Sequence, residues 1–82
     1  MEFETFGLNV AKIRQQKGIS AYELSLRLSK DPSYISKLES GKINITLKVI
    51  LQLAEILGVS ATEFFKKNKE QVWQFLNLLA KE

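Results

Sequence analysis

Hydroxyl groups and one cation gather on one side of the stretch between residues 33 and 40. At helical spacing, Ile35 and Leu38 point to one side, and the other side carries small or hydrogen-bonding residues: Ser33, Tyr34, Ser36, Lys37 and Ser40. An ordinary solvent-facing helix more often carries Glu and Lys four residues apart. The observed set suits a surface that enters a major groove, where base edges present hydrogen-bond donors and acceptors.

Most enzyme chemistry lacks its usual residues in this chain. Cysteine and histidine are absent, which removes thiol nucleophiles, disulfides, thiolate metal ligands and the commonest general base. The carboxylates are scattered without a facing pair, and no serine has a histidine to activate it. We therefore expect no enzyme, no catalytic residue, no metal site and no cofactor.

The composition fits a single soluble globular domain. The 82 residues are 45% apolar and 26% charged, far from the composition of disordered chains, and no apolar run approaches the about 20 residues of a membrane span. The N-terminus has no basic region ahead of an apolar stretch, so we expect a cytoplasmic protein without a secretory signal. The net charge of +3 permits a nucleic-acid partner without requiring one.

The spacing of apolar residues predicts an all-α fold of five or six helices. We expect helices at about 4–17, 20–28, 32–40 and 47–57, a short helix from 60, and a further helical stretch at 68–82. In the fourth helix the predicted apolar stripe consists of Leu47, Ile50, Leu51, Ala54 and Leu57, and it stops at Gly58.

Two kinds of start signal support these boundaries. Ser20 with Glu23, and Ser60 with Glu63, have capping-box spacing, in which the serine accepts from the glutamate amide and the glutamate reaches back. Asp31 followed by proline predicts that the third helix begins at residue 32, because proline is tolerated at the first helical position.

The second and third helices form the candidate functional unit. Only about three residues are expected between helices 20–28 and 32–40, so the two must cross steeply, as in a helix-turn-helix. We expect four apolar side chains to meet at this crossing and to leave the polar side of the third helix free: Leu24, Leu28, Ile35 and Leu38.

The register of these features resembles the Xre family, the Cro and phage-repressor type of helix-turn-helix protein. The resemblance covers about residues 6–65. It rests on an ordered set: Ile13 and Arg14, Gly18 and Ser20, Glu23 and Leu24, Ile35 and Ser36, Glu39, Gly41, Leu47, Leu53 and Ala54, Leu57 to Val59, and Phe64. It implies a lambda-repressor-like domain in which helix 32–40 reads the major groove and helix 20–28 lies across the phosphate backbone.

The resemblance also assigns roles to individual residues. It places the base contacts on Ser33, Tyr34 and Lys37. It places the contacts to the DNA backbone on Ala21, Ser36, Ser40, Lys42 and Asn44. It further implies an ion pair between Arg14 and Glu39 that joins the first helix to the third.

The chain departs from the family pattern at several positions of this motif. Ala21 stands where a DNA-contacting glutamine is common, so one side-chain contact is lost. Ser25 and Ser29 replace an alanine and a glycine and are small enough to keep the crossing, while Lys30 replaces a valine of the turn. Pro32 has no backbone N–H to offer a base.

The last segment predicts a second element beside the DNA-binding domain. We divide the chain into a helix-turn-helix domain at 1–66 and a C-terminal helix at 67–82, whose apolar arc of about 160° exceeds what one core covers. We expect a symmetric homodimer formed by Val72, Trp73, Leu76, Leu79 and Ala80. Two alternatives stay open: this helix folds back onto its own domain, or it receives a different protein.

These observations predict a sequence-specific DNA-binding transcriptional regulator, a repressor that binds a palindromic operator as a homodimer. The rival hypothesis is a protein-interaction module on the same frame, such as an antitoxin or an antagonist of another regulator, which Ala21 and Pro32 favour slightly. We expect double-stranded DNA as a partner, no membrane association and no small-molecule effector domain.

Overall fold

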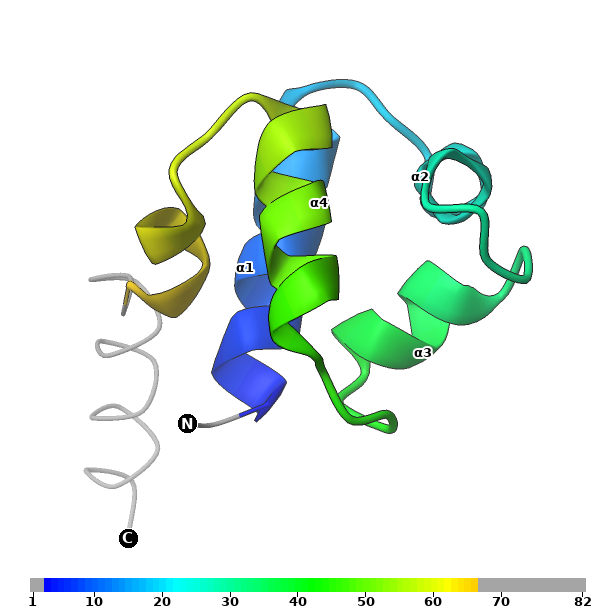
Figure 1. The fold of residues 1–82 in the computed structure, drawn as a ribbon, viewed down its shortest axis with the longest axis horizontal. Helices are drawn as coiled ribbons and strands as arrows, with labels where there is room; N and C mark the ends of the chain where they lie inside the picture. Colours follow the sequence, from blue (N-terminus) through cyan, green and yellow to red (C-terminus); the bar gives the residue numbers. More distant parts are fainter. Residues whose placement is uncertain (1–2, 67–82) are drawn as a thin grey trace, which may run out of the picture.

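The computed structural model describes residues 3–66, and their arrangement is shown in Figure 1. These residues form the helices α1 (Phe3–Gln16), α2 (Ala21–Arg27), α3 (Tyr34–Glu39) and α4 (Leu47–Leu57), followed by a short 3₁₀ helix, η1 (Ala61–Phe65). The described part is all-α, as predicted. The predicted domain division at 66/67, the helix at 68–82 and the predicted dimer residues lie outside the described residues.

One apolar core joins all five elements. α1 and α4 overlap in the view of Figure 1, with α2 and α3 to one side of them and η1 to the other. The ring of Phe6 meets the ring of Phe64 edge to face, with 5.5 Å between their centres, so the first and last elements close on one another. The buried core consists of Phe6, Val10, Ile13, Leu24, Leu28, Ile35, Leu38, Val49, Leu53, Leu57 and Phe64.

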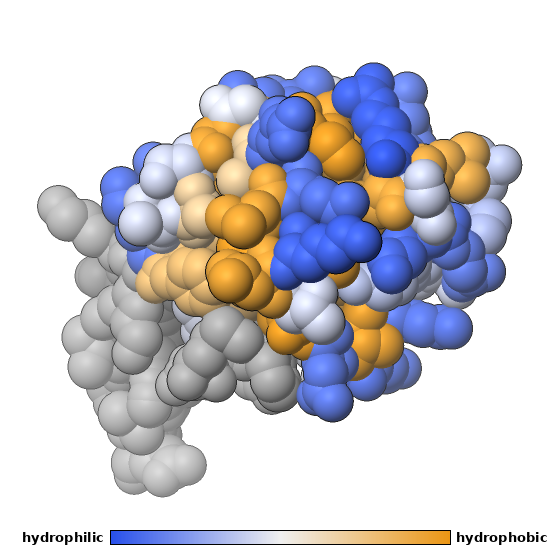
Figure 2. All heavy atoms as spheres, viewed as in Figure 1, coloured by the Kyte–Doolittle hydropathy of each residue, from blue (hydrophilic) through white to orange (hydrophobic). Residues whose placement is uncertain are grey.

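The buried side of α4 differs from the predicted stripe. Val49, Leu53 and Leu57 are buried, whereas Leu47 is 70% and Leu51 55% exposed. Eight of the eleven residues of α4 are apolar, so periodicity alone cannot choose which row faces the core. Figure 2 accordingly shows apolar surface over α4, in the middle of this face of the molecule. No helix within residues 3–66 has the length and apolar content to cross a bilayer.

Both predicted serine caps accept a backbone hydrogen bond, but neither forms the full predicted capping box. The Ser20 hydroxyl accepts from the amide of Glu23 at 3.0 Å, but the Glu23 carboxylate turns to Arg27 rather than back to the cap. At Ser60 the hydroxyl accepts from Thr62 instead of Glu63. The Glu63 amide already donates to the Ser60 carbonyl at 3.0 Å, a three-residue spacing that makes this segment a 3₁₀ helix rather than an α-helix.

Candidate nucleic-acid interface

A single buried hydroxyl connects α2 to α3. Ser25 is fully buried at their crossing. Its hydroxyl donates to the carbonyl of Ala21 at 2.8 Å and accepts from the backbone N–H of Ile35 at 3.0 Å. The first N–H groups of a helix have no partner within it, so Ser25 supplies the acceptor that the beginning of α3 needs. The predicted apolar contacts surround it, because Leu24, Leu28, Ile35 and Leu38 are all buried in one cluster.

The turn between α2 and α3 is longer than predicted. Residues 28–33 separate the two helices, against the three expected. Ser29 adopts a left-handed φ of 59°, its N–H donates to Leu26 at 2.9 Å, and the N–H of Lys30 donates to the Ser25 carbonyl at 3.0 Å. This is a Schellman ending, which usually places glycine at the left-handed position. α2 therefore stops at Arg27, one residue before its predicted end.

α3 begins two residues later than predicted. The Asp31 carboxylate accepts hydrogen bonds from the Ser33 backbone at 3.2 Å and from the Ser33 hydroxyl, and the Asp31 carbonyl accepts from the Tyr34 amide at 2.9 Å. These contacts form a tight turn at Pro32, so the first α-helical bond runs from Lys37 to the Ser33 carbonyl. Hydrogen bonds from Ser33 lower the pKa of Asp31 below its usual value.

The other end of α3 rests directly on α1. A side chain at Gly7 would lie only 2.5 Å from the Glu39 carbonyl oxygen, so the two backbones approach as closely as a glycine permits. Arg14 donates to Glu39 through Nε at 2.7 Å and Nη2 at 3.1 Å, and through Nη1 to the Ile19 carbonyl at 3.0 Å. The two side chains are only 13% and 14% exposed. The hydrogen bond with Glu39 raises the pKa of Arg14.

The exposed side of α3 carries most of the residues expected to contact DNA. Ser33, Ser36, Lys37 and Ser40 are exposed on α3 and its two flanking residues, and Lys42 and Asn44 are exposed in the loop that follows. The structure thus leaves these six residues accessible, with Ile35 and Leu38 buried on the inner side of α3. The Ser40 hydroxyl donates to the Lys37 carbonyl at 2.9 Å.

Two of the residues expected to contact DNA are less exposed than the others. Ala21 is half-buried at the start of α2, and Tyr34 is half-buried in the first turn of α3. Burial raises the pKa of the Tyr34 hydroxyl, so it is a neutral group that can donate or accept at neutral pH. The ammonium of Lys30 lies 5.3 Å from the centre of the Tyr34 ring, a cation–π distance.

Three residues that hold this surface were missed by the sequence analysis. Gly7 had no distinguishing signal, because its close contact depends on a helix more than thirty residues away in the chain. Asp31 was predicted only as a helix cap. Ser25 was predicted as a small residue, although a serine at a crossing of two helices is itself a signal for a buried hydrogen bond.

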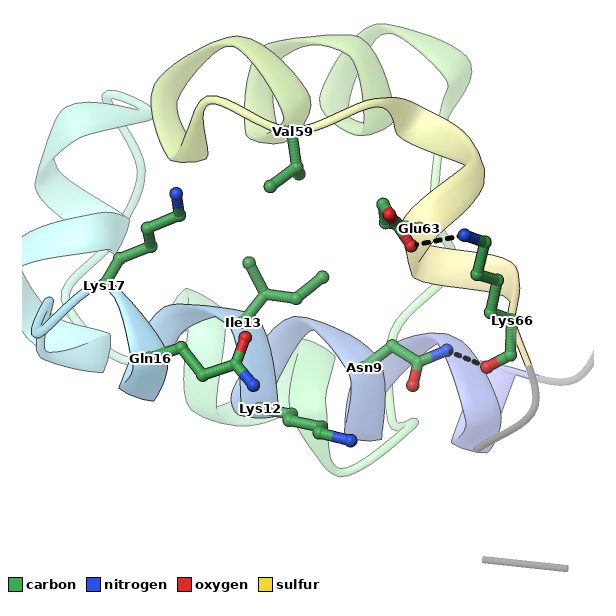
Figure 3. Close-up of a pocket in the computed structure, with 8 residues that line it drawn as sticks. All are labelled: Asn9, Lys12, Ile13, Gln16, Lys17, Val59, Glu63 and Lys66. Carbon is green, nitrogen blue, oxygen red and sulfur yellow. Dashed lines mark hydrogen bonds and ion pairs between the residues drawn. The ribbon is translucent and has the colours of Figure 1, made fainter. Parts of the chain in front are cut away.

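A pocket lies between α1 and η1, away from this surface. Its volume is about 400 Å³, and Figure 3 shows Lys12, Lys17 and Lys66 at its border with Ile13 and Val59 along its sides. Lys66 is paired with Glu63 at 3.0 Å. None of the residues expected to contact DNA lines it.

Two short, steeply crossing helices with an apolar seam and a polar outer face define a helix-turn-helix DNA-binding domain. A family model described as helix-turn-helix matches residues 10–64. The chain belongs to this family, the Xre and Cro type of DNA-binding helix-turn-helix transcription regulators. It is 36% identical over 64 residues to an HTH-type transcriptional regulator of Sinorhizobium fredii, y4dJ, a match that covers 78% of this chain and 83% of the relative.

Solved structures agree with this assignment. The restriction-modification controller protein C.AhdI of Aeromonas hydrophila is 32% identical, with a TM-score of 0.71 over 76% of this chain and 94% of that chain. A hypothetical transcription factor from Neisseria, NHTF, is 28% identical, with a TM-score of 0.77 over 90% of this chain and 85% of that chain.

Proposed function

We propose that the protein is a sequence-specific transcriptional repressor that binds a palindromic operator as a homodimer, with the segment 32–40 in the major groove. The observation that carries this proposal is the division of α3 into two sides. Ile35 and Leu38 are fully buried, while Ser33, Ser36 and Lys37 are exposed. A helix with this division can enter a groove without losing its contacts to the rest of the domain.

The proposed contacts fall into two groups. Ser33, Tyr34 and Lys37 contact base edges, because the N-terminal part of a recognition helix faces the bases. The groups around the edge of the surface contact phosphates and fix the register of the domain on the duplex. They are the backbone at Ala21 and the side chains of Ser36, Ser40, Lys42 and Asn44.

The homodimer is proposed to form through the segment 67–82, the second element beside the domain 1–66. Its support is the sequence pattern alone: the apolar residues expected at the interface are Val72, Trp73, Leu76, Leu79 and Ala80. A two-fold pair would set its recognition helices about 34 Å apart and match a palindromic site. Sedimentation equilibrium at micromolar concentration tests this, since a stable monomer that still binds a palindrome tightly would contradict it.

An electrophoretic shift on the DNA upstream of the protein's own gene tests DNA binding directly. A retained band in excess nonspecific competitor is expected. Titration at several salt concentrations measures how the binding constant depends on salt. Two or three lysine contacts per protomer predict a slope of log K against log salt of roughly −4 to −5, because each neutralised phosphate contributes about −0.9. A slope near zero, or a band lost equally to any competitor, would contradict the proposal.

The rival function, a protein-interaction module such as an antitoxin or an antagonist of another regulator, is supported by two residues. Ala21 offers the DNA backbone no polar side chain, and Pro32 offers no N–H at the tight turn before α3. The same shift experiment separates the two hypotheses, because an interaction module would give no band that depends on DNA sequence.

A further inference from the structure

The turn ahead of α3 presents a carboxylate where the proposed interface begins. Asp31 and Ser33 are both exposed. The Oδ2 atom of Asp31 accepts both hydrogen bonds from Ser33, which fixes the carboxylate against the first turn of the helix. The Ser33 hydroxyl proton is engaged in this contact, so Ser33 keeps only acceptor lone pairs for a partner.

Residues 31–33 offer a partner hydrogen-bond acceptors, and the cations of Lys30 and Lys37 lie beside them. Asp31 offers acceptors, Ser33 offers acceptors, and Pro32 between them has no N–H. The bonds from Ser33 and the nearby charge of Lys37 keep the pKa of Asp31 low, so the carboxylate is ionised at neutral pH. The ionised carboxylate would attract a hydrogen-bond donor.

Base edges in the major groove differ in what they offer such a group. Guanine and thymine present acceptors, and adenine presents its N6 amino group beside the N7 acceptor. Cytosine presents its N4 amino group as a donor, and carboxylates are its usual partners. A carboxylate thus fits cytosine best, and it fits adenine, which offers a donor beside an acceptor, better than guanine or thymine.

We propose that the Asp31 carboxylate, held by Ser33, is a specificity-determining group that accepts a hydrogen bond from the N4 amino group of a cytosine in each half-site. The inference rests on the proposed function and adds to it a residue outside the set assigned above to base contact. Ser33 then acts on this base through Asp31 and contacts bases only as an acceptor.

Selection of bound duplexes from a random DNA pool tests the assignment with three forms of the full chain. These are the parent, Asp31→Asn and Glu55→Gln, in which the same charge is removed from an exposed position of α4. The amide oxygen of Asn can still accept from Ser33, so the turn is kept. A second variant, Asp31→Ser, replaces the carboxylate by a small hydroxyl that can still accept a hydrogen bond, and it shows whether the result depends on one substitution. Circular dichroism verifies that each variant is folded.

The parent and Glu55→Gln are expected to select a motif with one cytosine position per half-site, preferred about tenfold in binding titrations. Both Asp31 variants should lose that preference and keep the rest of the motif. If they select the parent motif unchanged, the assignment is overturned while the proposed function stands. If the parent selects no motif at all, the proposed function itself fails.

Discussion

The two ends of α3 are held in different ways. The C-terminal end touches α1 through the close backbone approach at Gly7 and through the paired charges of Arg14 and Glu39. The N-terminal end depends on the Ser25 hydroxyl and on a turn that contains a left-handed serine, Ser29. The polar contacts that hold the end with the proposed base contacts thus come from α2 and the turn, whereas those at the other end come from α1.

This difference separates stability from recognition. Changes at the C-terminal end should lower the free energy of unfolding of the whole domain, because they loosen α3 from α1. Changes at the N-terminal end should mainly alter the position of the residues proposed to contact bases, and so the affinity for DNA. The predictions below test this division, beginning with the largest expected effect.

Replacing Glu39 by alanine should destabilise the domain most. The substitution leaves the guanidinium of Arg14, 13% exposed, without its carboxylate, and removing one partner of a buried pair costs about 3 to 5 kcal/mol. Urea or thermal unfolding measures the loss. The matched control is Glu23→Ala, whose pair with Arg27 is about half exposed and should contribute about 0 to 1 kcal/mol. Equal melts for Glu39→Ala and the parent would show that the pair contributes nothing.

Replacing Ser25 by alanine should cost less, about 1 to 3 kcal/mol, because it leaves the buried N–H of Ile35 without its acceptor. Ser36→Ala removes a hydroxyl from the exposed side of the same motif and should change unfolding by about 0.5 kcal/mol or less. Amide exchange at Ile35 gives a local readout and should accelerate in Ser25→Ala. An unchanged exchange rate at this amide would argue against the bridging role of Ser25.

The features that could be predicted from the sequence are those whose contact partners lie close by in the chain. The helix-turn-helix, the Ser20 cap and the end of the fourth helix at Gly58 depend on neighbours within a few residues, and the structure has them as predicted. Val49 is buried instead of Leu51 because of the elements that pack on α4. Since most residues of this helix are apolar, its sequence alone does not predict which side faces the core. The acceptor role of Ser25 depends on an amide ten residues away. The start of α3 depends on the turn at Pro32, where the Asp31 carboxylate accepts from Ser33 and the Asp31 carbonyl accepts from Tyr34.

Lys37 and Lys42 separate base reading from phosphate contact. Lys37→Ala is expected to lower discrimination at particular base pairs by about 1 to 2 kcal/mol, because a contact to a base edge is lost. Lys42→Ala should weaken all duplexes alike and make the salt slope less negative by about 1 per protomer. Titrations on the selected operator and on a scrambled duplex measure both effects. Equal losses on the two duplexes for both variants would contradict the division of roles.

The smallest expected effect has the opposite sign and concerns the turn. Ser29 has a φ of 59°, a conformation that costs a residue with a β-carbon about 1 to 2 kcal/mol. Glycine relieves this cost but loses more backbone entropy on folding, about 0.5 to 1 kcal/mol. Ser29→Gly should therefore stabilise the domain by about 0.5 to 1 kcal/mol.

Ser36→Gly is the matched control for this turn substitution, because it makes the same chemical change inside α3. Glycine is a poor helix former, so this variant should destabilise the domain by about 0.5 kcal/mol. Urea unfolding of the two variants beside the parent measures the difference in sign. If Ser29→Gly were also destabilising, a contact of the Ser29 side chain would have to outweigh the backbone strain, and the N-terminal attachment of α3 would be firmer than its turn geometry implies.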